Sequence, residues 1–380
     1  MSIRKNTWNL DGHYDLTNSG LNDYVGQNEL YIWGLNGWGQ LGQNNKIDYS
    51  SPVQLPGTQW ERSTHDYLTT LAKKTDGTLW QWGYNLWGQL GQNNDTPYSS
   101  PVQLPGTEWN NISALDLAFY STKTDGTLWA WGYNAYGKLG QNDKTNRSSP
   151  VQIPGTQWNY LASSSYGSLG AVTKTDNTLW VWGGNFYGQL GINDRAYRSS
   201  PTQIPGTAWN TASTNRYQAI AVKTDGTLWA WGLNEGGQLG DNSRTYRSSP
   251  TQIPGTQWSF AIVNSYISAY ATKTDGTLWG WGRNLNGELG QNDRTYRSSP
   301  VQIPGTSWDI TDNGLAQRYI ACTARKTDGT LWSWGYNYRG SGGVNNGGNN
   351  SYSSPVQIAG TQWAKTHRGS VYTSSAIKQA

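Results

Sequence analysis

The amino-acid sequence predicts an all-β fold, a seven-bladed β-propeller closed by pairing of N- and C-terminal strands in one split blade. The first observation is a repeat of about 50 residues marked by Trp-Gly pairs, a period typical of repeat proteins such as propellers. The second is that short alternating segments and turn residues fill each repeat, as strands joined by tight turns require. The third is that the two ends of the chain carry complementary parts of one repeat. The Trp-Gly pairs begin at Trp33, Trp82, Trp131, Trp182, Trp231, Trp281 and Trp334.

Each repeat contains an alternating strand of the form Thr-Leu-Trp-x-Trp-Gly, for example from Thr127 to Gly132. Alternation with aromatic and β-branched residues is typical of a β-strand. An Asp-Gly pair before this strand predicts a two-residue hairpin turn in which both residues adopt a positive φ. One repeat has Asp176-Asn177 instead, and Asn is the next-best residue for that conformation.

A second strand in each repeat reads Ser-Ser-Pro-Val-Gln-Ile, with a proline near its start, where a missing N–H is tolerated. The following Pro-Gly-Thr predicts a type II turn, whose third position favours glycine. All but three of the 23 tryptophans occupy three fixed positions of the repeat, so we interpret them as packing residues. The exceptions are Trp8, Trp38 and Trp87.

The two chain ends together supply one blade. Ala376-Ile377-Lys378 matches Ala221-Val222-Lys223, the strand that leads into the Asp-Gly turn, but no Trp-Gly strand follows it. Residues 30–34, LYIWG, provide that missing strand at the other end of the chain. Pairing of the two ends would close the ring and remove exposed sheet edges. We therefore divide the chain into an N-terminal extension, residues 1–26, and a propeller, residues 27–380.

Composition excludes several other classes. A single cysteine, Cys322, excludes a disulfide scaffold. No segment approaches the ~18 apolar residues of a membrane-spanning helix, and the start of the chain lacks the apolar stretch of a secretory signal. The formal net charge of +4 is too small to indicate nucleic-acid binding. We therefore expect a folded β protein that neither inserts into a membrane nor binds nucleic acid.

The segment Trp-Gly-x-Asn-x-x-Gly-Gln-Leu-Gly resembles the repeat of the regulator of chromosome condensation family. It occurs as WGLNGWGQLG from Trp33 and as WGYNLWGQLG from Trp82, and four similar copies follow. The seventh copy, WGYNYRGSGG from Trp334, departs from the pattern at its end. The resemblance covers residues 27–380 and implies a seven-bladed propeller closed by strands from the two termini.

The resemblance implies two kinds of function. The best-known member is a guanine nucleotide exchange factor for a small GTPase and also docks on chromatin. In that branch a Gly-x-x-His signature precedes the Asp-Gly turn, and this chain lacks it, as in the stretch NRYQAIAVK. The nearly identical repeats look like those of bacterial and phage-encoded members, which often sit in surface or virion-associated proteins. We therefore predict a non-catalytic recognition or structural propeller of a phage virion or surface assembly, which presents a binding face to a receptor, glycan or partner protein. A regulator of a small GTPase or other nucleotide-binding protein, with a cytoplasmic location, is the alternative.

Enzymatic chemistry, a cofactor and a metal site are not expected. Three scattered histidines and one cysteine do not supply zinc ligands. The histidines are not accompanied by a Gly-x-Ser-x-Gly motif, and the recurring Asp residues are explained by the hairpin turns that they stabilise.

Residues that differ between repeats are the candidate binding residues. In the fourth to sixth repeats, the loop before Ser-Ser-Pro contains Tyr-Arg and a second Arg three residues earlier. Tyr and Arg are typical of interaction surfaces, and arginine suits anionic groups. The alternative is a solvated loop in which arginines pair with Asp194 or Asp293 and tyrosines pack against the next blade. The set comprises Arg195, Tyr197, Arg198, Arg244, Tyr246, Arg247, Arg294, Tyr296 and Arg297.

Two further sets are aromatic. Trp38, Trp87, Tyr136 and Tyr187 precede Gly-Gln-Leu-Gly or Gly-Lys-Leu-Gly in the first four repeats, and we predict that they contact a partner or a sugar ring, with packing between blades as the alternative. Residues 1–26 do not match the repeat. We predict that Trp8, Tyr14 and Tyr24 in this segment dock on another chain of a larger assembly, with packing across the ring as the alternative.

Overall fold

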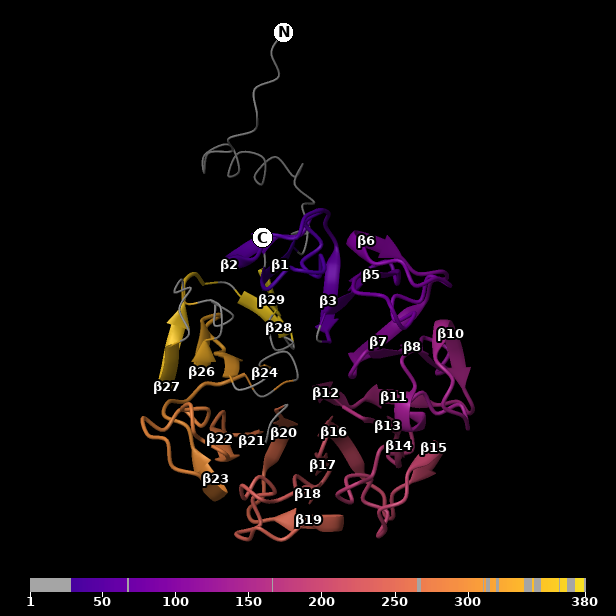
Figure 1. Ribbon diagram of the computed structural model, residues 1–380. Helices are drawn as coiled ribbons and strands as arrows, with labels where there is room; N and C mark the ends of the chain where they lie inside the picture. The colour runs from indigo at the N-terminus through magenta and orange to yellow at the C-terminus, as the bar shows by residue number, and fades with distance from the viewer. Residues whose placement is uncertain are drawn as a thin grey trace, which may run out of the picture.

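Figure 1 shows a ring of small β-sheets around a central axis in the computed structural model of the chain. The structure describes residues 29–380 apart from 67, 166, 265–267, 310, 312–314, 319–320, 338–343, 345–349, 362, 368–372 and 379–380. The described residues form seven sheets, which we number as blades 1 to 7 along the chain. The predicted all-β class and the propeller architecture are confirmed. One 3-10 turn, η1 (Ala135–Gly137), lies among the described loops.

The strands of the first four blades follow the repeat. Blade 1 contains β1 (Glu29–Gly34), β2 (Tyr49–Gln54), β28 (Trp363–His367) and β29 (Thr373–Lys378). Blade 2 contains β3 (Trp60–His65), β4 (Thr69–Lys74), β5 (Leu79–Gly83) and β6 (Tyr98–Gln103). Blade 3 contains β7 (Trp109–Ala114), β8 (Ala118–Lys123), β9 (Leu128–Gly132) and β10 (Arg147–Ile153). Blade 4 contains β11 (Trp158–Leu161), β13 (Leu169–Lys174), β14 (Leu179–Gly183) and β15 (Arg198–Gln203).

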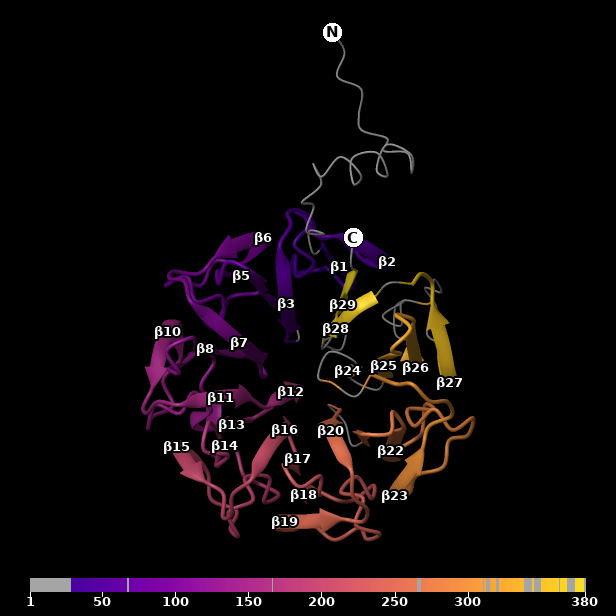
Figure 2. The ribbon, with the colours of Figure 1, turned by 180° about the vertical axis from the view of Figure 1, so that it is seen from behind.

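The remaining blades have the same order. Blade 5 contains β16 (Trp209–Asn215), β17 (Gln218–Lys223), β18 (Leu228–Gly232) and β19 (Arg247–Ile253). Blade 6 contains β20 (Trp258–Val263), β21 (Ser268–Lys273), β22 (Leu278–Gly282) and β23 (Arg297–Gln302). Blade 7 contains β24 (Leu315–Arg318), β25 (Ala321–Arg325), β26 (Leu331–Asn337) and β27 (Asn350–Ile358). The views from the two sides place strands such as β3 and β20 near the centre and β6 and β23 at the outside (Figures 1 and 2).

The two ends of the chain meet in blade 1. Strand β1 pairs antiparallel with β29, with Leu30 opposite Ile377 and Tyr31 opposite Ala376. The sheet order β2-β1-β29-β28 therefore combines residues from both ends, as the sequence predicts. An additional short strand was not predicted: β12 (Ser163–Ser165) leaves blade 4 and pairs in parallel with β16 of blade 5.

The hairpin turns differ from the prediction in one respect. In blade 2 the N–H of Lys74 bonds the carbonyl of Thr78, and the N–H of Gly77 bonds the carbonyl of Lys74, so the loop has three residues rather than two. Among Asp76 and Gly77, Gly77 alone has a positive φ, at 78°. Such a loop is a type I turn followed by one left-handed residue, and glycine or Asn fits only that last position. The Asp76 Oδ1 atom accepts the N–H of Thr78 at 2.9 Å, which fixes the turn.

The ring has two different faces. In blade 2, Leu79 pairs with Lys73 beside the Thr-Asp-Gly turn, and Gly83 pairs with Thr69 at the opposite end of the strands. We call the side with the Thr-Asp-Gly turns the hairpin face. The side with the long loops that follow the Trp-Gly strands is called the loop face.

Buried tryptophans connect neighbouring blades. The Nε1 atom of Trp231 in blade 5 donates to the carbonyl of Gln189 in blade 4 at 3.0 Å, and Trp281 in blade 6 makes the same bond to Gln238 in blade 5. The hydrophobic clusters also cross blade boundaries, as where Ile220 of blade 5 belongs to the same cluster as Trp281. These contacts show that the tryptophans of the Trp-Gly pairs pack between blades.

Candidate functional site

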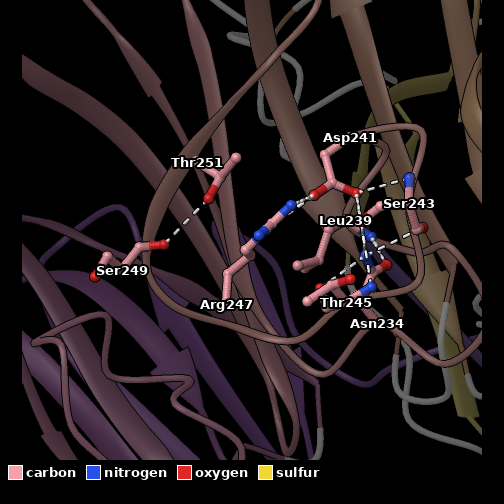
Figure 3. A network of polar contacts seen from close by, with 8 residues as sticks. All are labelled: Asn234, Leu239, Asp241, Ser243, Thr245, Arg247, Ser249 and Thr251. Atoms are coloured by element: carbon pink, nitrogen blue, oxygen red, sulfur yellow. Dashed lines mark hydrogen bonds and ion pairs between the residues drawn. The ribbon is translucent and has the colours of Figure 1, made fainter.

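A buried asparagine organises the long loop on the loop face in each of blades 1 to 6. In blade 5 the Asn234 Oδ1 atom accepts the N–H of Leu239 at 3.0 Å, and its Nδ2 atom donates to the carbonyls of Ser243 at 3.2 Å and Thr245 at 3.1 Å (Figure 3). An amide that both donates and accepts can satisfy several backbone groups of one loop. Equivalent buried residues are Asn36, Asn85, Asn134, Asn185 and Asn284.

The loops are also fixed to the next blade. The N–H of Asn193 in blade 4 donates to the carbonyl of Ser248 in blade 5 at 2.8 Å, and the Ser249 Oγ atom donates to Asn193 Oδ1 at 3.1 Å. Gly188 of blade 4 lies so close to the backbone of blade 5 that a Cβ added to it would meet Ser248 Cα at 2.6 Å. The repeated Ser-Ser-Pro therefore serves the junction between blades, and the loop presents its other side chains from a fixed position.

The first two predicted aromatic residues are exposed and touch the next blade. Trp38 is 39% exposed and Trp87 is 43% exposed. The ring centres of Trp38 and Tyr84 lie 4.8 Å apart, and those of Trp87 and Tyr133 lie 5.0 Å apart. Each tryptophan therefore packs across a blade junction, as the alternative interpretation predicts, and still offers a large apolar surface to solvent.

The other two predicted aromatic residues join the tyrosines of the Tyr-Arg loops. The Tyr136 ring of blade 3 lies 5.3 Å from Tyr197 of blade 4, and Phe186 lies 4.8 Å from Tyr197. Tyr187 of blade 4 lies 5.9 Å from Tyr246 of blade 5. The structure thus brings together two sets of residues that the sequence treats as separate. Phe186, which is 52% exposed, was not among the sequence candidates.

The arginine that precedes Ser-Ser-Pro is paired in each predicted loop. Arg198 reaches Asp194 Oδ2 at 2.6 Å, and Arg297 reaches Asp293 Oδ2 at 2.6 Å. Arg247 bonds Asp241 Oδ2 through Nε and Nη2 at 3.1 and 3.0 Å (Figure 3). These arginines close their own loops, which agrees with the alternative interpretation of this set.

The arginine three residues earlier is different. Arg195, Arg244 and Arg294 are exposed, and the described residues provide no ion pair for any of them. Lys46 and Lys144 occupy the same loop position in blades 1 and 3 and are also exposed. The loop face therefore carries an exposed positive charge at this loop position in blades 1 and 3 to 6, whereas blade 2 has the exposed Asp95 there.

Tyr296, the last residue of the predicted set, is half-buried and has no aromatic contact among the described residues. Tyr246 occupies the same loop position in blade 5. It donates its hydroxyl proton to Glu235 Oε1, and this hydrogen bond raises the pKa of Tyr246 to about 12. The Tyr246 hydroxyl group therefore remains protonated at neutral pH.

The sequence did not reveal a group of buried ionisable residues on the loop face. Burial raises the pKa of Asp66 to about 7 and lowers the pKa of Lys138 to about 8. Lys138 Nζ donates to the carbonyl of Asp116, and its ammonium lies 4.9 Å from the centre of the Tyr133 ring. The sequence contains one sign that Lys138 is unusual: four other repeats have Gln at its position and one has Glu.

Two properties concern the described residues only. No group of three or more His, Cys, Asp or Glu side chains in that part of the chain is arranged to hold a metal ion. It also contains no helix of the length and apolar character needed to cross a membrane. Trp8, Tyr14 and Tyr24, the predicted docking residues, lie outside the described residues.

A family model, the Regulator of chromosome condensation (RCC1) repeat, matches six segments that together cover more than half of the chain. The matched residues are 27–64, 76–114, 125–171, 176–216, 225–262 and 275–312. The model thus accounts for six repeats, whereas the sheets number seven, and blade 7 lies beyond the last match. No curated protein sequence matches the chain.

Several solved structures share the fold. Human WBSCR16 has a TM-score of 0.79 at 19% identity, and the alignment covers 93% of this chain and 99% of that one. Prp20p from Saccharomyces cerevisiae, described with its binding properties to Gsp1p and histones, has a TM-score of 0.81 at 18% identity, with 94% and 92% covered. Yeast Prp20 bound to Kap60 has a TM-score of 0.79 at 18% identity, with 93% and 89% covered. At these identities the similarity shows the fold alone.

Proposed function

Because the chain belongs to the regulator of chromosome condensation (RCC1) repeat family, we propose that it is a non-catalytic propeller that recognises a protein partner through its loop face. One observation carries the proposal: exposed aromatic side chains line the junctions of blades 1 to 4, and the loops of blades 4 to 6 on the same face carry arginines that have no ion pair among the described residues. The propeller supplies the frame, and the loops that differ between blades supply the specificity.

The exposed aromatic residues support an interface. Trp87 and Phe186 each leave about half of a large apolar side chain in contact with water. Tryptophan, tyrosine and arginine are the residues whose truncation most often weakens protein complexes. Since neighbouring aromatic rings already hold one another in place, these side chains would lose little conformational entropy when a partner binds.

The charges indicate an acidic partner surface. The exposed guanidinium groups of Arg195, Arg244 and Arg294 can form paired hydrogen bonds with carboxylates. The neighbouring carboxylates of Asp194 and Asp293 are already bound to Arg198 and Arg297, so they do not neutralise the outer arginines.

The test is site-specific photo-crosslinking in the source cells. A photoreactive amino acid replaces Trp87 on the loop face or, as a control, Thr124, which is exposed on the hairpin face. We expect one protein to crosslink at position 87 and not at position 124, and the purified protein to bind the unmodified chain in equimolar amounts. Equal capture at both positions, or none at position 87, would contradict the proposal.

Regulation of a small GTPase is the second candidate. It is favoured by the similarity to Prp20p, which was studied for binding to Gsp1p, and the comparisons support it better than a role in a phage virion. The release of a fluorescent guanine nucleotide from Gsp1p should accelerate when the chain is added if this candidate is correct. An unchanged release rate would argue against it for this GTPase.

The remaining finer predictions need their own tests. Attachment to a phage virion or surface assembly through residues 1–26 predicts co-purification with a larger particle, which removal of this segment abolishes. Binding of the aromatic residues to a glycan predicts a signal on a glycan array that is lost in Trp87→Ala.

We also propose that blade 7 is a degenerate seventh repeat, because β24 to β27 have the same order as the strands of the matched blades.

A further inference from the structure

On the hairpin face a lysine lies between two tryptophans in six blades. In blade 5 the Lys223 ammonium lies 4.6 Å from the ring centre of Trp209 and 4.9 Å from that of Trp229. Cation–π attraction favours this position and holds the ammonium in one place. The same arrangement, with distances between 4.6 and 5.0 Å, occurs at Lys74, Lys123, Lys174, Lys273 and Lys326.

Two of these lysines line cavities between blades. A cavity of about 430 Å³ at the junction of blades 4 and 5 is lined by Lys223 and its two tryptophans, together with Asn193 and Pro250. A second cavity, of about 500 Å³, lies at the equivalent junction of blades 3 and 4. It is lined by Lys174, Trp158 and Trp180 with Asn142 and Pro201, among others. We call these two cavities the inter-blade clefts.

Two kinds of donor that line the clefts have no protein acceptor among the described residues. Within the described residues, the ammonium groups of Lys174 and Lys223 make no ion pair or hydrogen bond. The buried Nε1 atoms of Trp158 and Trp209 also have no partner there. No Asp or Glu lines either cleft.

The acidic group in the adjacent turn, Asp225, does not neutralise the cleft. Lys223 lowers the pKa of Asp225 in the adjacent turn, but the larger cause is the hydrogen bond from Thr227. The Asp225 Oδ1 atom accepts both the Oγ1–H and the N–H of Thr227, at 2.6 and 2.9 Å. This carboxylate is therefore committed to its own hairpin turn, and the ammonium remains available.

We propose that the inter-blade clefts bind the carboxylated sugar units of a uronic-acid polysaccharide. The ammonium matches the carboxylate, and the indole and proline surfaces match the apolar face of a pyranose ring. The lysine and tryptophans recur from blade to blade, so a polymer with a repeating unit could occupy several junctions and gain affinity from their number. The lysines and tryptophans of the clefts are not among the residues of the proposed function, so the two proposals stand or fall separately.

Calorimetric titration of the full chain with a short oligomer of galacturonic acid tests this inference. We expect the acid to bind and its methyl ester, which keeps the rings but removes the charge, to bind at least about tenfold more weakly. This comparison uses the unmodified chain and so does not depend on the folding of a variant. Equal binding of the acid and the ester, or absence of binding by the acid, would overturn the proposal.

Variants then locate the site. Lys174→Met together with Lys223→Met should lower the number of oligomers bound per chain. The matched control, Lys144→Met together with Arg195→Met, removes two exposed charges from the loop face and should leave that number unchanged. An equal loss in both variants would show that general charge attracts the oligomer and would overturn the site. Poly-glutamate binding as tight as that of the saccharide would overturn the preference for sugar.

Discussion

The two faces of the ring differ in how they use the repeat. On the hairpin face the same lysine and two tryptophans recur in six blades with nearly the same distances. On the loop face one repeat position is Trp38, Trp87, Tyr136, Tyr187, Gly236 and Asn286 in successive blades. Both faces share one backbone, so the difference lies in the side chains that the loops present.

This difference separates two kinds of recognition. A surface that changes from blade to blade has only one orientation for a folded partner, whereas a surface that repeats offers equivalent positions to a repeating ligand. The residues that build the ring also repeat, because each blade must fit its neighbours. Substitutions can therefore test which repeated residues hold the ring together and which loop residues are free to bind.

The largest effect is expected from the buried tryptophans between blades. Trp182→Ala and Trp281→Ala should each lower the free energy of unfolding by about 3–5 kcal/mol, because each leaves a cavity and removes an indole hydrogen bond to the preceding blade. The two losses should agree within about 1 kcal/mol, since the sites are equivalent. Trp87→Ala, at an exposed site, should cost less than about 1 kcal/mol. Denaturant unfolding measures all three, and a large loss in Trp87→Ala would show that this side chain belongs to the frame.

Asp66 breaks the equivalence of the blades on the loop face. It accepts the N–H groups of Leu68 and Thr69, as Asn215 does for the corresponding residues of blade 5. Burial raises the pKa of Asp66 from 3.8 to about 7, so the folded chain binds more protons than the unfolded chain between about pH 4 and 7. The contribution of Asp66 to stability therefore falls as the pH rises through this window.

Asp66→Asn should remove this dependence. The variant should be more stable than the unmodified chain at pH 8 by on the order of 2 kcal/mol and should lose this advantage near pH 4. Burial lowers the pKa of His65 to about 3, which has the opposite effect in part of the same window, but His65 is present in both proteins and cancels in the difference. Thermal unfolding across this pH range is the measurement, and a pH-independent difference would show that folding does not raise the pKa of Asp66.

Gly39 and Gly37 lie in the same loop, but a side chain has no room at Gly39 and open space at Gly37. Gly39 has a φ of 79°, and a Cβ there would meet Ser99 Cα of the next blade at 2.5 Å. Gly37 has no atom within 4 Å of an added Cβ. Gly39→Ala should therefore cost about 2–3 kcal/mol of unfolding free energy, and Gly37→Ala less than about 0.5 kcal/mol. Similar values in the two variants would contradict the close contact between blades.

The smallest effect separates the two arginines of one loop. Arg198→Ala should cost about 0.2–1 kcal/mol, because its ion pair with Asp194 is partly exposed to solvent. Arg195→Ala should leave the unfolding free energy unchanged within error, since the described residues give Arg195 no ion pair. Binding of an acidic partner should show the reverse order, with the larger loss in Arg195→Ala.

The fold was predictable because its determinants lie within one repeat. Alternation, turns and the matching chain ends are visible in sequence, and the pairing of Leu30 with Ile377 confirms them. The predicted length of the hairpin loop at Thr-Asp-Gly was wrong, because an Asp-Gly pair fits both a two-residue and a three-residue loop. The parallel strand β12 has no local signal in its three serines, since its partner lies in another blade.

The candidate site was less predictable because it depends on contacts between blades. The pairing of Arg198 with Asp194 follows from sequence spacing and was weighed as an alternative. The contact of Tyr136 with Tyr197 could not be inferred, since it depends on how far two adjacent blades lie apart. The lysine between two tryptophans was missed because its three residues are separated along the chain and meet only in the folded blade.

The central claim is that loop-face residues that differ between blades bind the partner. The most direct measurement compares the affinities of Trp87→Ala and Asn286→Ala, which occupy the same repeat position, for the protein captured by crosslinking. We predict at least about a tenfold loss in Trp87→Ala and less than about a twofold change in Asn286→Ala. Equal losses, or no loss in Trp87→Ala, would contradict the claim.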